Sequence, residues 1–396
     1  MVKHLPCRCG MGNRSHEASA RTRTDRERRF MVTRRDFVGS AAATSLGAAF
    51  AGTAQAGQGT VIPASGNGDG IIDVHCHALL PRWLDRAAAF QGRTRETMNI
   101  AQSPVPDWTP ELHIATMDAH GIEASVLSWP SATAMVRGKE AKDFARALNE
   151  DLANIIARHP GRFGAFAILP LDDMDATLEE MAYCLDVLKF DGASSSTHVG
   201  GVYLGDSHFD PWFAEMNRRG ATLFVHPTTP PGQTETPIGI NPSILEFMFE
   251  TSRMVTNMVV SGAKTRFDKI KFISSHGGGT IPYLATRISI LEPHYGPGPG
   301  REPMTGEEIL KTLSTFYFDL TASTAPASLD AIRHLVPDSQ LMFGTDFPMM
   351  PPTTIAPAKA RFDAYAPLGA DERRAILRDS ALAILPSLSA RVGKGG

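Results

Sequence analysis

Two histidines stand one residue apart at the end of an apolar run. The stretch Ile71–Trp83 reads IIDVHCHALLPRW, and its β-branched start predicts a strand that ends at His75 and His77. Side chains two residues apart on a strand share a face, so both imidazoles should point to one side and Cys76 to the other. Two neutral imidazoles with this spacing are suited to binding a metal ion. A pair of structural histidines has the same spacing, so the motif alone does not decide.

More side chains that can bind metals follow other apolar runs of the chain. Runs that end in LFVHP, ISSHGGG and FGTDFP place His226, His276 and Asp346 at the ends of three further strands. With the first pair, five imidazole or carboxylate groups end four strands, in a chain with 13 histidines. This joint pattern favours a metal site over isolated structural histidines. Asp73 lies two residues before His75 and is expected to share its face and to orient the histidine pair.

The elements that would position these residues alternate along the chain. Eight short β-rich runs, each followed by a segment with helical periodicity, occupy residues 71–390; the runs are 71–75, 123–129, 163–169, 190–197, 221–226, 269–276, 316–321 and 340–346. This alternation predicts a single-domain α/β fold, the (β/α)8 TIM barrel, with its site at the C-terminal ends of the strands. A doubly wound sheet would place a Gly-rich phosphate turn after its first strand, and HCHALLPRW contains no glycine.

Charge and cysteine usage narrow the class of protein. Residues 1–56 hold 10 of the 39 Lys and Arg and 4 of the 42 Asp and Glu, so the remaining residues carry 29 basic and 38 acidic side chains. This negative body argues against a nucleic-acid partner. Of the four cysteines only Cys76 and Cys184 lie in the body, so neither a disulfide framework nor a cysteine-type zinc site is expected.

The N-terminal segment has the layout of an export signal. The stretch TRRDFVGSAAATSLGAAFAGTAQAG combines Arg34 and Arg35 with a weakly apolar run and a small-residue motif that ends at Ala56. It resembles a bacterial twin-arginine signal, which implies the twin-arginine export machinery as a partner and a periplasmic or secreted location. The run is too short and too weakly apolar for a stable membrane anchor. We expect a disordered N-terminus, with Met31 as an alternative start, a signal up to residue 56 and a linker over residues 57–70.

The strand-end residues also carry a family resemblance. The HxH pair, the two later histidines and the final aspartate resemble the amidohydrolase superfamily, and in detail its aminocarboxymuconate-semialdehyde decarboxylase branch. The stretches VYLGDSHFDPWFAEMNRRGATLFVHPTTP, SHGGGTIPYLATRI and FYFDLTAS…LMFGTDFP are similar to 6-methylsalicylate decarboxylase-like members. The resemblance implies a homodimer and one divalent metal ion held by His75, His77, His226 and Asp346, with His276 beside the metal-bound water or the substrate.

One departure from the binuclear members of that superfamily predicts a single ion. Those members need an anionic bridge, usually a carboxylated lysine at the end of strand four. Here that end reads ASSSTHV, and Lys189 precedes the strand. His198 lies close to this strand end, where it could reach the site or pack over the substrate pocket.

Three imidazoles and one carboxylate leave an open position on the ion, which is typical of a catalytic metal. Zinc suits this nitrogen-rich set, and manganese is the alternative. The resemblance favours a decarboxylase, a carboxy-lyase acting on a small aromatic or unsaturated carboxylic acid such as a 2-hydroxybenzoate. Asp346 would then donate a proton to the ring carbon with help from His276. The alternatives are a hydrolase of a lactone or cyclic amide and a non-enzymatic exported metal-binding protein.

Three residues are weaker candidates for contacts with the substrate. Trp129 ends the second strand and Phe347 follows the predicted metal-binding aspartate, so both could wall a flat ring. Arg82 follows the HxH pair and could bind a carboxylate. Plain packing of the two aromatic residues and a solvated arginine fit the sequence equally well.

Overall fold

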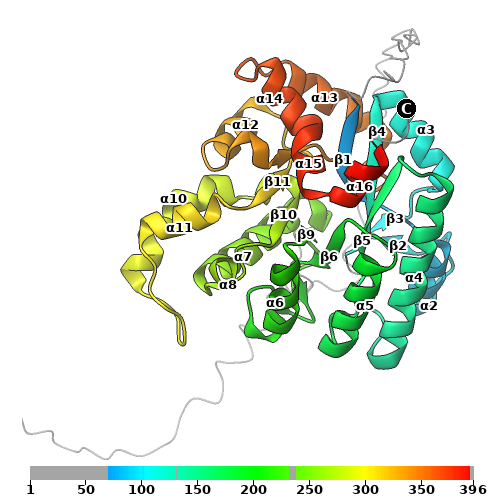
Figure 1. Ribbon diagram of the computed structural model, residues 1–396, viewed down its shortest axis with the longest axis horizontal. Coiled ribbons are helices and arrows are strands. Elements are labelled where there is room, and N and C mark those ends of the chain that lie inside the picture. The colour runs from blue at the N-terminus through cyan, green and yellow to red at the C-terminus, as the bar shows by residue number, and fades with distance from the viewer. Residues whose placement is uncertain (1–69, 101, 131, 232–237, 393–396) are drawn as a thin grey trace, which may run out of the picture. The chain divides into compact units, whose positions relative to one another are not determined.

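The computed structural model describes residues 70–100, 102–130, 132–231 and 238–392 (Figure 1). The predicted export signal and nearly all of the predicted linker lie outside these ranges. Among the described residues, no helix has both the length and the apolar character needed to cross a membrane.

Eight parallel strands form one sheet whose spatial order equals their order in the chain. They are β1 (Ile71–His77), β4 (Ile122–Ser128), β5 (Phe163–Ala167), β6 (Gly192–Ser196), β9 (Thr222–His226), β10 (Lys271–Ser274), β11 (Tyr317–Asp319) and β12 (Leu341–Met342). The sheet closes because Asp73 and Cys76 of β1 form parallel bridges with Phe343 and Phe347, just after β12. The (β/α)8 barrel predicted from the sequence is therefore confirmed.

Helices cover the outside of the barrel (Figure 1). The main ones are α2 (Pro81–Phe90), α3 (Pro110–His120), α4 (Gly138–Arg158), α5 (Met174–Asp186), α6 (Asp210–Arg219), α7 (Glu246–Val260), α10 (Ile281–Tyr295), α11 (Gly306–Leu313), α12 (Pro326–Arg333) and α13 (Ile355–Asp363). Shorter helices are α8 (Ala263–Arg266), α9 (Ser275–Gly278), α14 (Ala370–Arg374), α15 (Ser380–Ile384) and α16 (Pro386–Val392). Two hairpins, β2 (Asn99–Ile100) with β3 (Ser103–Pro104) and β7 (His198–Val199) with β8 (Val202–Tyr203), lie in loops after β1 and β6.

The core has two parts, one inside the barrel and one between strands and helices. The inner part contains Ile72, Val74, Phe166 and Phe224, and α15 and α16 add apolar side chains to it. Because both faces of the sheet are covered, all seven residues of β1 are buried. Apolar side chains therefore fill the barrel, which leaves the C-terminal ends of the strands as the place for polar groups.

A bulge in β1 decides which side chains point into the barrel. Its pairing with β4 shifts between Asp73 and Cys76, so one extra residue is inserted there. Ile72 and Val74 therefore point inward before the bulge, and His75 contacts the inner Phe224 ring after it, with 5.1 Å between the two ring centres. Simple alternation would keep Asp73 on the face of His75, and that prediction is wrong.

Candidate metal centre

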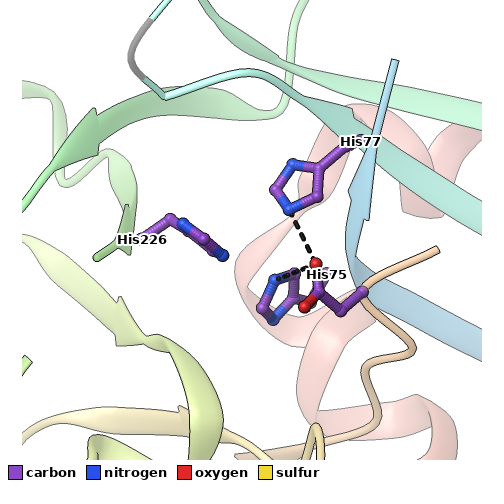
Figure 2. Close-up of side chains that lie close together, drawn as sticks. His75, His77 and His226 are labelled. Atoms are coloured by element: carbon purple, nitrogen blue, oxygen red, sulfur yellow. Dashed lines mark ion pairs between the residues drawn. The ribbon is translucent and has the colours of Figure 1, made fainter. Parts of the chain in front are cut away.

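Four side chains from three strand ends converge at the mouth of the barrel. His75 and His77 come from β1, His226 ends β9, and Asp346 follows β12. One nitrogen or oxygen of each lies within 4.8 Å of the others. Figure 2 shows the three imidazole rings facing a common point. All four residues were expected from the sequence to bind the metal, and the structure brings them together.

Hydrogen bonds set the ring orientation of all three histidines. His75 Nδ1 lies 3.0 Å from an oxygen of Asp319, and His226 Nδ1 donates to the carbonyl oxygen of Pro227 at 2.7 Å. His77 Nδ1 lies 3.3 Å from the Ser128 hydroxyl, which itself donates to a backbone carbonyl. With Nδ1 as the donor in each ring, every Nε2 keeps a lone pair free for a metal ion.

The atoms that face the common point have no hydrogen-bond partner. His75 Nε2, His77 Nε2, His226 Nε2 and Asp346 Oδ1 are buried and unpaired. Asp346 Oδ1 lies 3.0 Å from His77 Nε2 and 3.4 Å from His75 Nε2. When all three rings are neutral, lone pairs that approach this closely repel unless a cation lies between them, and two ligands of a tetrahedral zinc ion are about 3.3 Å apart. The four residues therefore fit a single divalent metal ion.

The pKa shifts of the candidate ligands also fit a bound cation. Burial would lower the pKa of His75, but the carboxylates of Asp319 and Asp346 raise it to about 10. Burial lowers the pKa of His77 and, together with neighbouring histidines, lowers that of His226 well below its usual value. Burial would raise the pKa of Asp346, but His75 and the other histidines hold it far below its usual range. The centre therefore attracts one positive charge, and a metal ion would replace the proton on His75.

His276 lies beside these ligands in a strained backbone. Its Nε2 is 3.5 Å from Asp346 Oδ2, and both residues have positive φ angles, 55° for His276 and 59° for Asp346. Such angles are costly for residues other than glycine and persist only where neighbours hold them. For Asp346 the support is a 2.7 Å hydrogen bond from its backbone N–H to the carbonyl oxygen of His75.

The glycines after His276 serve packing. A Cβ on Gly278 would lie 2.7 Å from the Phe318 ring, and one on Gly279 would lie 2.3 Å from the carbonyl oxygen of Met248. The turn therefore packs closely against β11 and α7, which fixes the position of His276.

A pocket of about 350 Å3 leads to the candidate metal centre. His77, His226 and Asp346 line its inner end, and the walls include Trp83, Trp129, Ile100, Met135, Phe247 and Met349. None of the described residues that line it is Lys or Arg. A larger groove of about 1080 Å3 lies between the β7–β8 hairpin and α7, but none of the four candidate ligands lines it. The smaller pocket is therefore the candidate substrate site.

Comparison with known proteins assigns the chain to a family. Residues 72–386 match the family model described as Amidohydrolase. The chain belongs to the amidohydrolase family.

Two curated relatives of this amidohydrolase are fungal enzymes. Decarboxylase yanB of Aspergillus niger is 32% identical over 342 residues, which cover 82% of this chain and 90% of the relative. The 6-methylsalicylic acid decarboxylase of Penicillium expansum is 31% identical over 331 residues, 82% of this chain and 98% of the relative. These matches agree with the branch that the sequence motifs indicated.

A solved structure supports the fold. The 5-carboxyvanillate decarboxylase of Novosphingobium aromaticivorans, determined with manganese and a nitrobenzoic acid, superimposes with a TM-score of 0.70. The match is 20% identical and covers 80% of this chain and 96% of that structure. At this identity the likeness establishes the barrel architecture alone.

The weaker candidates for substrate contacts differ in whether they line the pocket of the amidohydrolase barrel. Trp129 lines the pocket and meets His77 edge to face, with ring centres 5.3 Å apart. Phe347 does not line the pocket; it is buried against the His113 ring at 4.9 Å. Arg82 does not line the pocket and pairs with Asp151 at 3.1 Å, which agrees with the alternative of a solvated arginine.

His198 neither joins the metal centre nor lines the pocket. Its Nδ1 accepts a hydrogen bond from Gly201 N, and its Nε2 lies 3.3 Å from the carbonyl oxygen of Thr229 and 3.6 Å from buried Glu250. Because Thr229 lines the pocket, His198 supports the pocket wall from behind. The structure therefore places His198 outside the metal centre and against a wall residue of the pocket, without lining the pocket itself.

Sequence reasoning missed two residues of the site. Asp319 ends β11 and contacts His75; its only signal in the sequence was an acidic residue within the apolar run FYFDL. Trp83, from α2, packs edge to face against Trp129 with 4.5 Å between ring centres, and it lines the pocket. Its only signal was an aromatic residue shortly after the HxH pair, which is also typical of helix packing.

Proposed function

We propose that this amidohydrolase is a metal-dependent, non-oxidative decarboxylase of a small aromatic acid with a hydroxyl group next to its carboxylate, such as a 2-hydroxybenzoate. The observation that carries the proposal is the convergence of four unpaired ligand atoms at the inner end of an aromatic pocket. The relatives that align over most of the chain are decarboxylases, which favours carbon–carbon cleavage over the hydrolase alternative.

His75, His77, His226 and Asp346 would hold the ion. When bound, it supplies positive charge that polarises the oxygens of the substrate and stabilises charge developing in the transition state. Three imidazole nitrogens favour zinc. Manganese is the alternative, because a decarboxylase of the same fold binds it.

The proton is the central problem of this reaction. Loss of CO2 from an aromatic ring without prior protonation would leave an aryl anion, and no described cationic side chain lines the pocket to stabilise one. Protonation of the ring carbon first avoids that anion. The carbon–carbon bond then breaks, its electrons return to the ring, CO2 leaves and the new proton stays on the ring carbon.

We assign this proton transfer to Asp346 and His276. Asp346 lines the pocket, and His276 Nε2 lies 3.5 Å from Asp346 Oδ2. Because neighbouring histidines hold the pKa of Asp346 low, its carboxyl is ionised at rest. The proton would therefore pass from His276 to Asp346 and on to the ring carbon. Proton transfer by positioned groups contributes about 10²–10⁴-fold to such rates.

The charge of the pocket supports a substrate with one carboxylate. No described lining residue is Lys or Arg, and residues 101, 131 and 232–237 contain neither in the sequence. A second carboxylate on the substrate would therefore lose its hydration without gaining a side-chain cation. Trp83 and Trp129 offer flat apolar surfaces for one aromatic ring.

The test is a substrate screen on protein loaded with zinc or with manganese. We expect CO2 release from a 2-hydroxybenzoate in a panel of hydroxybenzoates and lactones. The matched control is His226→Ala, which removes one candidate ligand and should be inactive. Ring opening of lactones without any CO2 release would overturn the decarboxylase proposal in favour of a hydrolase.

We also propose export by the twin-arginine machinery to the periplasm or beyond, on the basis of Arg34, Arg35 and the small-residue motif before residue 57. Arg34→Lys with Arg35→Lys should leave the unprocessed protein in the cytoplasm of a bacterial host, as measured by cell fractionation. Export of this variant at the wild-type level would contradict the proposal.

A homodimer is the proposed assembly. Several large apolar side chains are exposed near the start of α7 and along α10, namely Ile240, Ile244, Phe249, Tyr283, Ile290 and Tyr295. Apolar exposure of this kind is typical of interaction sites. Sedimentation should give twice the mass of one chain, and Phe249→Asp should shift the protein toward the monomer. A wild-type monomer at high concentration would contradict this assembly.

A further inference from the structure

We propose that Asp319 is a positioning residue of the metal centre, which fixes the nitrogen that His75 leaves free and holds the backbone that carries His276. The proposal rests on the metal centre proposed above and does not depend on which reaction that centre catalyses.

Asp319 ties three segments of the barrel together. It is the last residue of β11 and has no exposed surface. Its Oδ2 lies 3.0 Å from His75 Nδ1, on β1. Its Oδ1 accepts hydrogen bonds from the backbone N–H groups of His276 at 3.1 Å and Thr321 at 3.0 Å. Both oxygens are therefore used, and each has a different task.

The first task concerns the tautomer of His75. An ionised carboxylate can only accept hydrogen bonds, so His75 Nδ1 must carry a proton and Nε2 must keep the lone pair. Thr321 Oγ1 also lies 3.1 Å from Nδ1, but a hydroxyl can donate or accept and so cannot impose a tautomer. In this centre Asp319 is therefore the group that directs the free nitrogen of His75 toward the ligand cluster.

Close packing around Gly344 holds His75, Asp319 and Thr321 in contact. A Cβ on Gly344 would lie 2.8 Å from the Cβ of His75, 3.2 Å from Asp319 Oδ1 and 2.4 Å from Thr321 Oγ1. The absence of a side chain at Gly344 is what allows these three residues to meet. The same packing leaves His75 little room to turn away from Asp319.

The second task concerns His276. Its φ angle of 55° is unfavourable for an L-residue and needs compensation from its surroundings. The backbone N–H of His276 points at Asp319 Oδ1, so one carboxylate supports both a candidate metal ligand and the proposed proton carrier. This hydrogen bond adds to the packing of Gly278 and Gly279 in holding the turn that presents the His276 ring.

The decisive variant is Asp319→Asn, which has nearly the same shape. Two backbone N–H groups point at the Oδ1 position, so the amide oxygen must occupy it. The amide N–H2 group then faces His75 Nδ1, which must become an acceptor. The proton of His75 moves to Nε2 and blocks the nitrogen that would bind the metal.

We expect Asp319→Asn to lower metal affinity by about 10–100-fold, as measured by competition with a chelator. Nitrogen-15 spectra of histidine-labelled protein, at a zinc concentration that loads only the wild type, should place the His75 ring proton on Nδ1 in the wild type and on Nε2 in the variant. A purely structural role would change the unfolding temperature without moving that proton.

The matched control is Asp73→Asn. Asp73 is similarly buried, at 1% exposure, and it accepts hydrogen bonds from the backbone of His75 and from Thr345, but it forms no hydrogen bond with an imidazole ring. This variant should lose stability and keep its metal affinity within about threefold of the wild type. Equal losses of affinity in the two variants would overturn the proposal.

A third variant keeps the proposal testable if Asp319→Asn does not fold. Thr321→Val removes the other Nδ1 neighbour of His75 and should leave metal affinity within about twofold, because Asp319 remains. A loss of tenfold or more would assign the tautomer to Thr321 and overturn our assignment. A wild-type protein that binds no metal would instead refute the metal centre itself, which is a distinguishable result.

Discussion

Two neighbouring clusters of residues that can bind metals each include side chains from β1. The first is the candidate metal centre of His75, His77, His226 and Asp346, and the second consists of Asp73, Cys76 and His113. In each, the potential ligand atoms lie within 4.8 Å of one another. By residue type and distance alone, both would qualify as metal sites.

Their hydrogen bonds distinguish them. In the second cluster, Asp73 accepts from the backbone and hydroxyl of Thr345, Cys76 Sγ donates to the carbonyl oxygen of Val126 at 3.2 Å, and His113 Nδ1 accepts from Trp108 at 3.1 Å. In the first cluster, the four inward-facing atoms have no such partner. The comparison teaches that convergent unpaired lone pairs, rather than residue types, indicate a metal site.

Among variants that keep most of the metal affinity, the largest effect is expected for Asp346→Asn within the first cluster. The amide keeps an oxygen that can face the ion, but it cannot carry the proton. We expect much of the metal affinity to remain while turnover falls by about 10²–10⁴-fold, measured as CO2 release at saturating metal. Near-normal turnover would remove Asp346 from the proton-transfer role.

A pair of variants compares the two clusters for metal binding. His226→Ala removes one of the four convergent atoms and should lower metal affinity by more than about 100-fold. Cys76→Ala changes the second cluster and should leave one equivalent of metal bound. Elemental analysis after dialysis checks both. Loss of metal in Cys76→Ala would show that the second cluster also takes part.

The second cluster should instead affect the pH dependence of the free energy of unfolding. Burial, with Arg162 and His77, lowers the pKa of His113 to about 3. Its contribution to stability is therefore complete above pH 6.5 and is lost as the pH falls from 6.5 toward 3, because the unfolded state binds the proton first. The loss amounts to about 1.4 kcal/mol per pH unit.

His113→Gln keeps an acceptor for Trp108 and removes this titration. Urea unfolding between pH 6.5 and pH 4.5 should show a shallower loss of stability for the variant than for the wild type. The matched control is His208→Gln on an exposed turn. Parallel pH profiles for His113→Gln and the wild type would contradict the assignment.

The smallest effect is expected outside both clusters. Arg82→Ala breaks an exposed ion pair with Asp151 and should change kcat/KM by less than about twofold, because exposed pairs contribute at most about 1 kcal/mol. A tenfold rise in KM would show that Arg82 reaches the substrate in solution.

Much of this site was predictable because its residues mark the ends of strands. His75, His77, His226, His276 and Asp346 all follow apolar runs, and parallel strands in a closed barrel bring such ends together. The eight-strand order was predictable for the same reason. The hairpins β2–β3 and β7–β8 were not, because two-residue strands leave too little pattern to detect.

By itself, the sequence determined the period of each element, the residue types at each strand end and hence the barrel and the candidate ligand set. Tertiary structure alone decided the bulge that turns His75 inward, the contact between His75 and Asp319 across 244 residues of chain, and the outward direction of Arg82. The reason is that periodicity is a local property of the chain. Which nitrogen of a buried histidine is free depends on partners that only the closed barrel brings within reach.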